Sequence, residues 1–154
     1  MEVEDEELKR LYEKFSSDPY CRLLGIKLLE LKRGYSKVSL KVTGDMLNFH
    51  GVAHGGLILS LADAAFAAAS NSHNRVALAL NININYRRPV KAGEELIAEA
   101  FEESLGKATA LYRMMVKDSA GNIVAICEGL VYRRDEPVVN KLSRSGLHKN
   151  ISDF

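Results

Sequence analysis

A glycine-rich segment, residues 48–56 with the sequence NFHGVAHGG, runs directly into an alanine-rich stretch of good helix formers. Its last two residues, Gly55 and Gly56, stand where the helix is expected to begin, and the first N–H groups of a helix have no partner within the helix. Together with the helix dipole, these N–H groups can bind a carbonyl oxygen that is acquiring negative charge. Glycine also allows close approach of a second backbone, so the alternative is that the pair serves tight packing alone.

Asp63 is the second candidate for chemistry, because it lies inside the expected helix over residues 57–70, LILSLADAAFAAAS. Aspartate is a poor residue for the interior of a helix. Leu59, Phe66 and Ala67 share its helical face, so its carboxylate is expected to be partly desolvated. Such a carboxylate is a candidate catalytic base or nucleophile. The alternative is an aspartate on the solvated side of the helix.

The spacing of these two candidates restricts how they can cooperate. Asp63 follows Gly55 by eight residues, which is about 12 Å along a helix that rises 1.5 Å per residue. A catalytic base must lie within hydrogen-bond reach of the reacting atoms, directly or through one water. The two residues of one chain are therefore too far apart, whereas a twofold dimer can bring opposite ends of two antiparallel helices together.

Other kinds of site fit the sequence less well. His50 and His54 have a spacing found in metal sites, but the glycine-rich stretch is not helical and has no acidic third ligand beside it, so we expect no metal. The glycines match neither the dinucleotide-binding pattern nor the phosphate-binding loop. Ser60 and Ser70 lack the strand–turn–helix motif of a serine nucleophile.

The elements that must position these residues follow from the periodicity of apolar residues. Residues 3–17 have apolar residues near helical spacing and predict an amphipathic N-terminal helix, which Asp18 and Pro19 should end. From Cys21 to Thr43 the alternation indicates two strands or one long bent strand. The stretch 57–70 is the one strong central helix.

Every regular element after Asn74 is expected to be a strand, and the tail beyond Pro137 is polar and aperiodic. Residues 76–86 should form a strand with one apolar face, and the spacing of turns beyond it suits antiparallel hairpins. A sheet of this composition must cover one face with the helix, which predicts an α+β domain. The apolar face comprises Val76, Leu78, Leu80, Ile82, Ile84 and Tyr86, and three further strands are expected over 96–103, 107–117 and 122–133.

Composition indicates an ordinary globular protein. The 154 residues, 17.1 kDa in mass, suit a single domain, and the formal charge of +1 gives no basic footprint for nucleic acid. The cysteines Cys21 and Cys127 cannot form a disulfide framework. The first seven residues carry five acids, the reverse of a signal peptide, and no apolar run approaches the roughly 20 residues of a membrane span. We therefore expect a cytoplasmic protein that binds neither nucleic acid nor membrane.

Residues 48–71, NFHGVAHGGLILSLADAAFAAASN, closely resemble the signature of hotdog-fold acyl-CoA thioesterases, in particular the PaaI-like (phenylacetate-pathway) group. Residues 86–100 and 121–134 are similar to later strands of that family, and the resemblance covers roughly residues 20–133. It implies a curved antiparallel sheet wrapped around one long central helix, with an extra N-terminal helix. The implied division is an N-terminal helix over 1–19, a hotdog domain over 20–135 and a polar C-terminal extension over 136–154.

The resemblance also implies roles for individual residues. Asp63 would be the general base or the nucleophile, and the Gly55 N–H would polarise the thioester carbonyl. Asn48 would position the water or the carbonyl, and His54 would shape the turn before the helix. In the family, Asp of one subunit faces Asn and Gly of its partner, which implies a homodimer or a homotetramer. Coenzyme A belongs to the substrate, and no cofactor is implied.

Further residues are candidates for substrate binding. Ala79 stands where the family often has a Ser or Thr partner for the catalytic Asp, and Asn81, expected on the same strand face, could substitute for it. Arg87 and Arg88 could contact the phosphates of coenzyme A, or could be ordinary solvated charges. The full set of substrate-binding candidates is Gly56, Phe66, Asn81, Arg87 and Arg88.

Three functions remain open at this point. The first is hydrolysis of an acyl-CoA that carries an aryl or medium-chain group, because Leu47, Phe49 and Phe66 suggest an apolar pocket wall. The second is a hotdog dehydratase or hydratase, although no histidine is evidently paired with the acid. The third is a non-catalytic module that binds acyl-CoA and regulates another protein, and Asp63 favours chemistry over that role.

Overall fold

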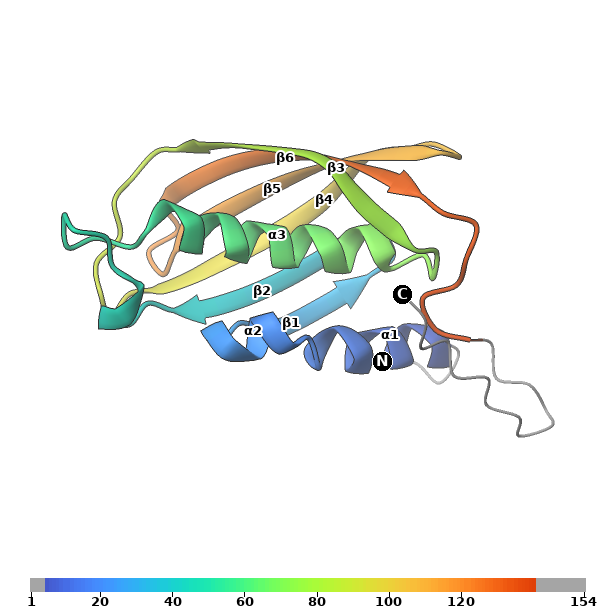
Figure 1. Ribbon diagram of the computed structural model, residues 1–154, viewed down its shortest axis with the longest axis horizontal. Helices are drawn as coiled ribbons and strands as arrows, with labels where there is room; N and C mark the ends of the chain where they lie inside the picture. Colours follow the sequence, from blue (N-terminus) through green and yellow to red (C-terminus); the bar gives the residue numbers. More distant parts are fainter. Residues whose placement is uncertain (1–4, 141–154) are drawn as a thin grey trace.

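A six-stranded antiparallel sheet curves around one long helix in the computed structural model, which describes residues 5–140 (Figure 1). The sheet order is β1-β2-β4-β5-β6-β3, so β1 and β3 form its two edges. The predicted α+β architecture is confirmed, and so are the three late strands and their antiparallel pairing. The strands are β1 (Lys27–Lys32), β2 (Tyr35–Lys41), β3 (Ala77–Tyr86), β4 (Glu95–Leu105), β5 (Thr109–Asp118) and β6 (Ile123–Arg133).

The central helix α3 (Gly55–Asn71) crosses the concave face of the sheet and begins two residues before the predicted start. Its alanines let the strands approach the helix closely, and the Phe66 ring fills the remaining space beside Tyr112 at a centroid distance of 5.8 Å. Gly129 of β6 makes room for that ring, since a Cβ there would lie 1.7 Å from a Phe66 ring carbon. The buried residues of α3 are Leu57, Ile58, Leu61, Ala62, Ala65, Phe66, Ala68, Ala69 and Ser70.

The edge strand β3 departs from the predicted alternation. Its pairing with β6 shifts between Ala79 and Asn81, where a β-bulge places one extra residue in β3. A bulge reverses which residues point to the core, so the prediction of a single apolar face from 76 to 86 is wrong. Leu78 and Leu80 are 51% and 59% exposed, whereas Ile82 and Ile84 pack against the core.

Two helices precede the sheet instead of one. Helix α1 (Glu6–Ser16) is followed by a short helix α2 (Pro19–Leu24), so the predicted strand character from Cys21 to Leu24 is wrong. The Asp18 side chain accepts a hydrogen bond from the Cys21 N–H, and proline is well suited to the first position of a helix. The Asp18-Pro19 pair therefore ends one helix and begins the next.

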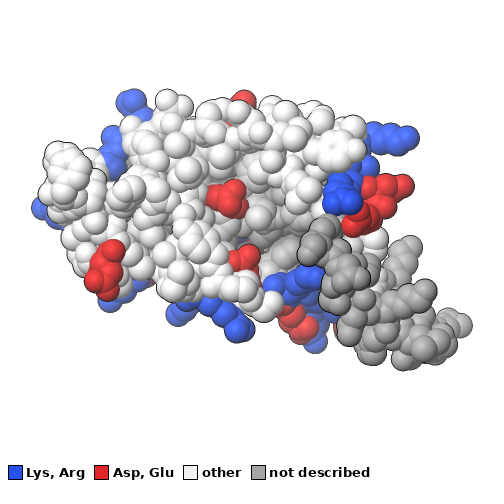
Figure 2. Space-filling view, viewed as in Figure 1, with Lys and Arg blue, Asp and Glu red and all other residues white. Residues whose placement is uncertain are grey.

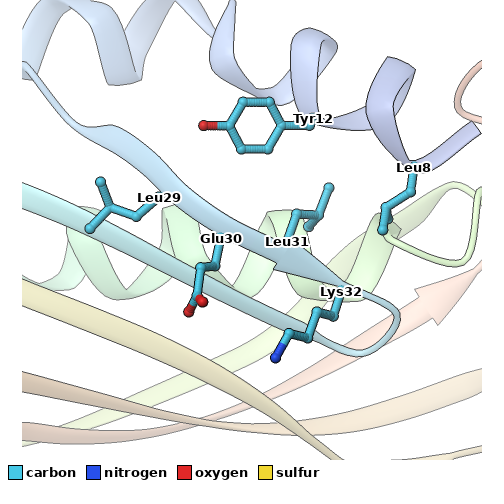
Figure 3. Close-up of a pocket in the computed structure, with 6 residues that line it drawn as sticks. All are labelled: Leu8, Tyr12, Leu29, Glu30, Leu31 and Lys32. Carbon is cyan, nitrogen blue, oxygen red and sulfur yellow. The ribbon is translucent and has the colours of Figure 1, made fainter. Parts of the chain in front are cut away.

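Helix α1 covers the outer strand β1. Leu8 and Leu11 of α1 are buried against Leu31, and the Tyr12 hydroxyl donates a 2.7 Å hydrogen bond to the Leu28 carbonyl. A hollow of about 450 Å³ remains between helix and strand, with Leu31 directed toward α1 (Figure 3). Covering an edge strand in this way limits its pairing with other chains.

Near the C-terminal end, the described structure includes residues up to 140, and two of these pack against the N-terminal helix. Val138 and Val139 pack against the cluster between α1 and β1. Most of the predicted C-terminal extension, residues 141–154, lies outside the described residues, as do residues 1–4. No helix between residues 5 and 140 is long and apolar enough to cross a membrane.

Candidate active site

A cleft of about 390 Å³ opens where the start of α3, the end of β3 and the loop before α3 meet. Four residues predicted from the sequence line this cleft together: Asn48, Gly55, Arg87 and Arg88. The sequence places them up to 40 positions apart. Antiparallel pairing of β3 with β6 brings the arginines to the helix start, where Val52, Ala53, Ile58, Tyr86 and Pro89 complete the lining.

His54 is the N-cap of α3. Its backbone N–H donates to the Met46 carbonyl at 2.9 Å, and its ring Nδ1 accepts the Gly56 N–H at 2.9 Å. A nitrogen that accepts a hydrogen bond carries no proton, so the neutral ring has its proton on Nε2. The His54 side chain thus satisfies one of the N–H groups that the helix leaves unpaired.

The Gly55 N–H is the remaining donor at the helix start. No hydrogen-bond acceptor reaches it among residues 5–140, whereas the Gly56 N–H is taken by His54. The Gly55 carbonyl accepts a 2.8 Å hydrogen bond from the Tyr86 hydroxyl. At the positive end of the helix dipole, a free N–H facing a cleft can stabilise an oxyanion.

Asn48 closes the loop that precedes α3. Its Oδ1 accepts the N–H of His50 at 2.9 Å and that of Val52 at 3.4 Å, while Gly51 turns the chain with a φ of 80°. The amide oxygen is therefore engaged within the loop. Only the Nδ2 group remains for a ligand, so Asn48 can act on a substrate as a hydrogen-bond donor and not as an acceptor.

Asp63 lies on the exposed side of α3, two helical turns beyond Gly55 and outside the cleft. Burial raises the pKa of its carboxyl above the ordinary value, and the nearby Asp18 carboxylate raises it further. Helix α2 lies against α3 here, with the Tyr20 hydroxyl 3.0 Å from that of Ser60. The direction of this shift agrees with the partial desolvation expected from the sequence, although the residue is exposed in the single chain, and the charge of Asp18 at the start of α2 adds to the shift.

Comparison with known proteins shows which family this chain resembles. Residues 50–125 match the family model of the thioesterase superfamily. A putative esterase of Archaeoglobus fulgidus is 48% identical over 79% of this chain and 79% of its own length. The acyl-coenzyme A thioesterase PaaI of Escherichia coli is 36% identical over 77% of this chain and 85% of its own length. The chain belongs to the PaaI-like hotdog thioesterases.

The solved structure of the Escherichia coli PaaI protein supports the same assignment. It superposes with a TM-score of 0.81 at 33% identity and covers 84% of this chain and 94% of that one. The family and the hotdog fold expected from the sequence are thus confirmed, and this PaaI-like thioesterase is an enzyme that hydrolyses thioesters.

Two substrate-binding candidates of the thioesterase lie away from the cleft. Phe66 is 1% exposed and packs in the core. Asn81 pairs with Leu130, whereas Ala79 pairs with the buried Val131. The bulge therefore puts Asn81 and Ala79 on opposite faces of β3, and the expectation that they share a face is wrong.

The two arginines differ in their surroundings. Arg88 Nη1 lies 3.4 Å from an oxygen of Asp118, a carboxylate whose pKa is lowered mainly by the hydrogen bond from the Asn122 N–H. The side chain of Arg87 has no hydrogen-bond or ion-pair partner between residues 5 and 140. Arg87 is thus the freer of the two, and an adjoining hollow of about 590 Å³ is lined by Arg88 and Lys91.

Sequence reasoning missed two residues of this PaaI-like thioesterase. The sequence pattern places Tyr86 only on an apolar strand face, whereas the folded chain places it in the wall of the cleft with its hydroxyl on the Gly55 carbonyl; its position directly before Arg87 is the signal in the sequence. The pattern at Asp18 predicts only the end of a helix, whereas its carboxylate also raises the pKa of Asp63. Within residues 5–140, no group of three or more His, Cys, Asp or Glu side chains could hold a metal ion.

Proposed function

We propose that this enzyme hydrolyses an acyl-CoA with an aryl or medium-chain acyl group and releases the free acid and coenzyme A. The observation that carries the proposal is the Gly55 N–H at the start of α3, which has no acceptor within residues 5–140 and lines the same cleft as Asn48 and Arg87. The name of the related Escherichia coli protein, an acyl-coenzyme A thioesterase, supports coenzyme A as the carrier.

The proposed chemistry assigns one task to each group. The Gly55 N–H and the helix dipole stabilise the negative charge that develops on the thioester oxygen, and Asn48 Nδ2 donates to the same oxygen or to the water. Asp63 takes a proton from the attacking water, or attacks the carbonyl itself to give an anhydride that water then opens. In both routes a C–O bond forms, the C–S bond breaks, and the thiolate of coenzyme A takes up a proton.

A complete site requires a second subunit. Asp63 lies two turns of α3 away from Gly55, so the Asp63 that serves Gly55 has to come from a partner chain. Strand β3 is an edge of the sheet and can pair with the β3 of a second copy. Figure 2 shows that the face over α3 is mostly uncharged, with two acidic patches near its middle and side chains of both charges around its rim. The largely uncharged surface suits burial in an interface. We propose a homodimer, assembled further into a homotetramer.

The phosphates of coenzyme A would lie at the end of β3. Arg87 is exposed and free to make bidentate contacts there, and Arg88 and Lys91 add positive charge next to it. Hydrolysis of a thioester changes no oxidation state, so the proposed reaction uses no redox cofactor, and the proposal assigns activation of the water to Asp63 and not to a metal.

Asp63→Asn tests this function most directly, because the amide keeps the shape of the side chain but removes the base. With a panel of acyl-CoA substrates and detection of the free thiol, kcat should fall about 10²–10⁴-fold. The raised pKa of Asp63 means that its ionisation lowers stability as pH rises through that pKa. The free energy of unfolding of the variant at pH 7 should therefore hold or rise.

Asp135→Asn is the matched control, because Asp135 is an exposed acid beyond the end of β6. It should retain the kcat of the unmodified enzyme. A fully active Asp63→Asn enzyme would end the catalytic assignment. Binding of acyl-CoA without release of thiol by the unmodified enzyme would instead support a non-catalytic acyl-CoA-binding protein.

A further inference from the structure

The peptide between Gly55 and Gly56 is held from both sides by side chains. The Tyr86 hydroxyl donates to its carbonyl at 2.8 Å, and His54 Nδ1 accepts its N–H at 2.9 Å. The two side chains come from different elements, the end of β3 and the residue before α3. One peptide plane at the helix start is thus tied both to the sheet and to the preceding loop.

Glycine makes such restraint necessary at this point. A glycine has access to far more backbone conformations than any other residue, and here two glycines form the first two positions of a helix. Tyr86 also packs closely, since a Cβ on Gly55 would lie 3.1 Å from its hydroxyl and 3.2 Å from the ring carbon that bears it. The glycine therefore makes room for Tyr86, and Tyr86 in turn restricts the glycine.

We propose that Tyr86 is a positioning residue for the reaction, an inference that rests on the proposed role of the Gly55 N–H. Tyr86 holds the Gly55–Gly56 peptide on one side of Gly55, and the hydrogen bond from the His54 N–H to the Met46 carbonyl holds the chain on the other side. Both backbone dihedral angles of Gly55 are therefore restrained. These angles set how the His54–Gly55 peptide, which carries the Gly55 N–H, is turned relative to the held Gly55–Gly56 peptide, and so they fix the direction of that N–H at the cleft. An oxyanion donor stabilises charge only when it is aimed at the developing oxyanion beforehand.

Tyr86→Phe tests the proposal, because it removes only the hydroxyl and keeps the ring in the wall of the cleft. We expect kcat for acyl-CoA hydrolysis to fall about tenfold, less than the 10²–10³-fold cost of losing an oxyanion donor itself. KM should stay within about twofold of the original value, since the lost bond is made to the backbone and not to the substrate. Amide hydrogen exchange at Gly56 should become faster, because its peptide is no longer held from the carbonyl side.

Tyr132→Phe is the matched control. Tyr132 lies on β6 and is 47% exposed, close to the 48% of Tyr86, so the two residues are matched in overall exposure. This variant should keep kcat, KM and Gly56 exchange unchanged. A structural effect alone would lower the melting temperature of Tyr86→Phe without a selective loss of kcat.

Each outcome decides the proposal. Equal kcat and equal Gly56 exchange in Tyr86→Phe and Tyr132→Phe would overturn it, and so would a raised KM at unchanged kcat, which would make Tyr86 a substrate contact. Asp63→Asn is measured alongside. If that variant remains fully active, the proposed function fails, while Gly56 exchange still shows whether Tyr86 holds this peptide.

Discussion

At the scale of single residues, Asp63 is a carboxylate whose ionisation the fold disfavours. Burial is the larger cause of its raised pKa, and the charge of Asp18 is the second. Asp18 also caps α2 through its Oδ1, so the same carboxylate serves the local fold and the electrostatics of the proposed base. A base with a raised pKa is a stronger proton acceptor once it is ionised.

Asp18→Asn separates these two roles, because asparagine can still accept the capping hydrogen bond but carries no charge. Loss of the negative charge lowers the pKa of Asp63 toward its ordinary value. The ionised base is then present at lower pH, so the acidic limb of the profile of kcat/KM against pH should move to lower pH. Asp135→Asn should leave the limb in place, and an unmoved limb in Asp18→Asn would contradict the electrostatic link.

The difference between the two arginines gives a second prediction at this scale. Arg87→Ala should raise KM for acyl-CoA about three- to tenfold with little change in kcat, because the contact is made to a non-reacting part of the substrate. Arg88→Ala should raise KM less, since its guanidinium already pairs with Asp118. Steady-state kinetics at low salt compare the two. Unchanged KM in both variants would assign them to the solvated surface.

At the scale of elements, the contact between α3 and β6 depends on Gly129. The Phe66 ring lies where a side chain at position 129 would begin. A packed interior resists added volume, because side chains must leave their preferred rotamers to accommodate it.

Gly129→Ala should therefore lower the free energy of unfolding by about 1–3 kcal/mol, as for other overpacked cores. Chemical denaturation measures the change. Phe66→Leu in the same chain removes the ring that the new methyl group meets, so the double variant should lose less than the sum of the two single changes. Strict additivity would show that the two residues do not share this space.

At the scale of the whole molecule, the edge position of β3 and the position of Asp63 both support the proposed assembly. The edge offers those N–H and C=O groups of a ten-residue strand that point away from β6. Exposed edges of this length are normally paired or covered. Pairing by a second copy would bury the edge and complete the site in the same step.

Mixing two inactive variants tests the shared site. Asp63→Asn and Asn48→Ala dimers should each be nearly inactive, but a mixed dimer has one site with both defects and one with neither. When equal amounts exchange subunits, about half of the dimers are mixed and each of these has one intact site out of two. The mixture should therefore regain about a quarter of the original activity. Light scattering should show at least a dimer. Absence of complementation, or full activity in a monomer, would place the whole site within one chain.

Features that depend on local pattern could be predicted from the sequence alone. The central helix follows from a run of strong helix formers, and the late strands follow from alternation and turn residues. The glycine pair and Asp63 stood out because their types are unusual at those positions. The family resemblance drew on the same short segment, so the fold class was predictable from the sequence.

Features that depend on pairing between distant segments could not be predicted from the sequence and are visible only in the folded chain. The bulge in β3 arises from its register against β6, and it separates Asn81 from Ala79. Phe66 lies in the core because Gly129 leaves space for it, and Tyr86 reaches Gly55 because the sheet brings the end of β3 to the helix start. Periodicity along one segment contains no information on which residue of another segment lies opposite, and these contacts depend on that choice.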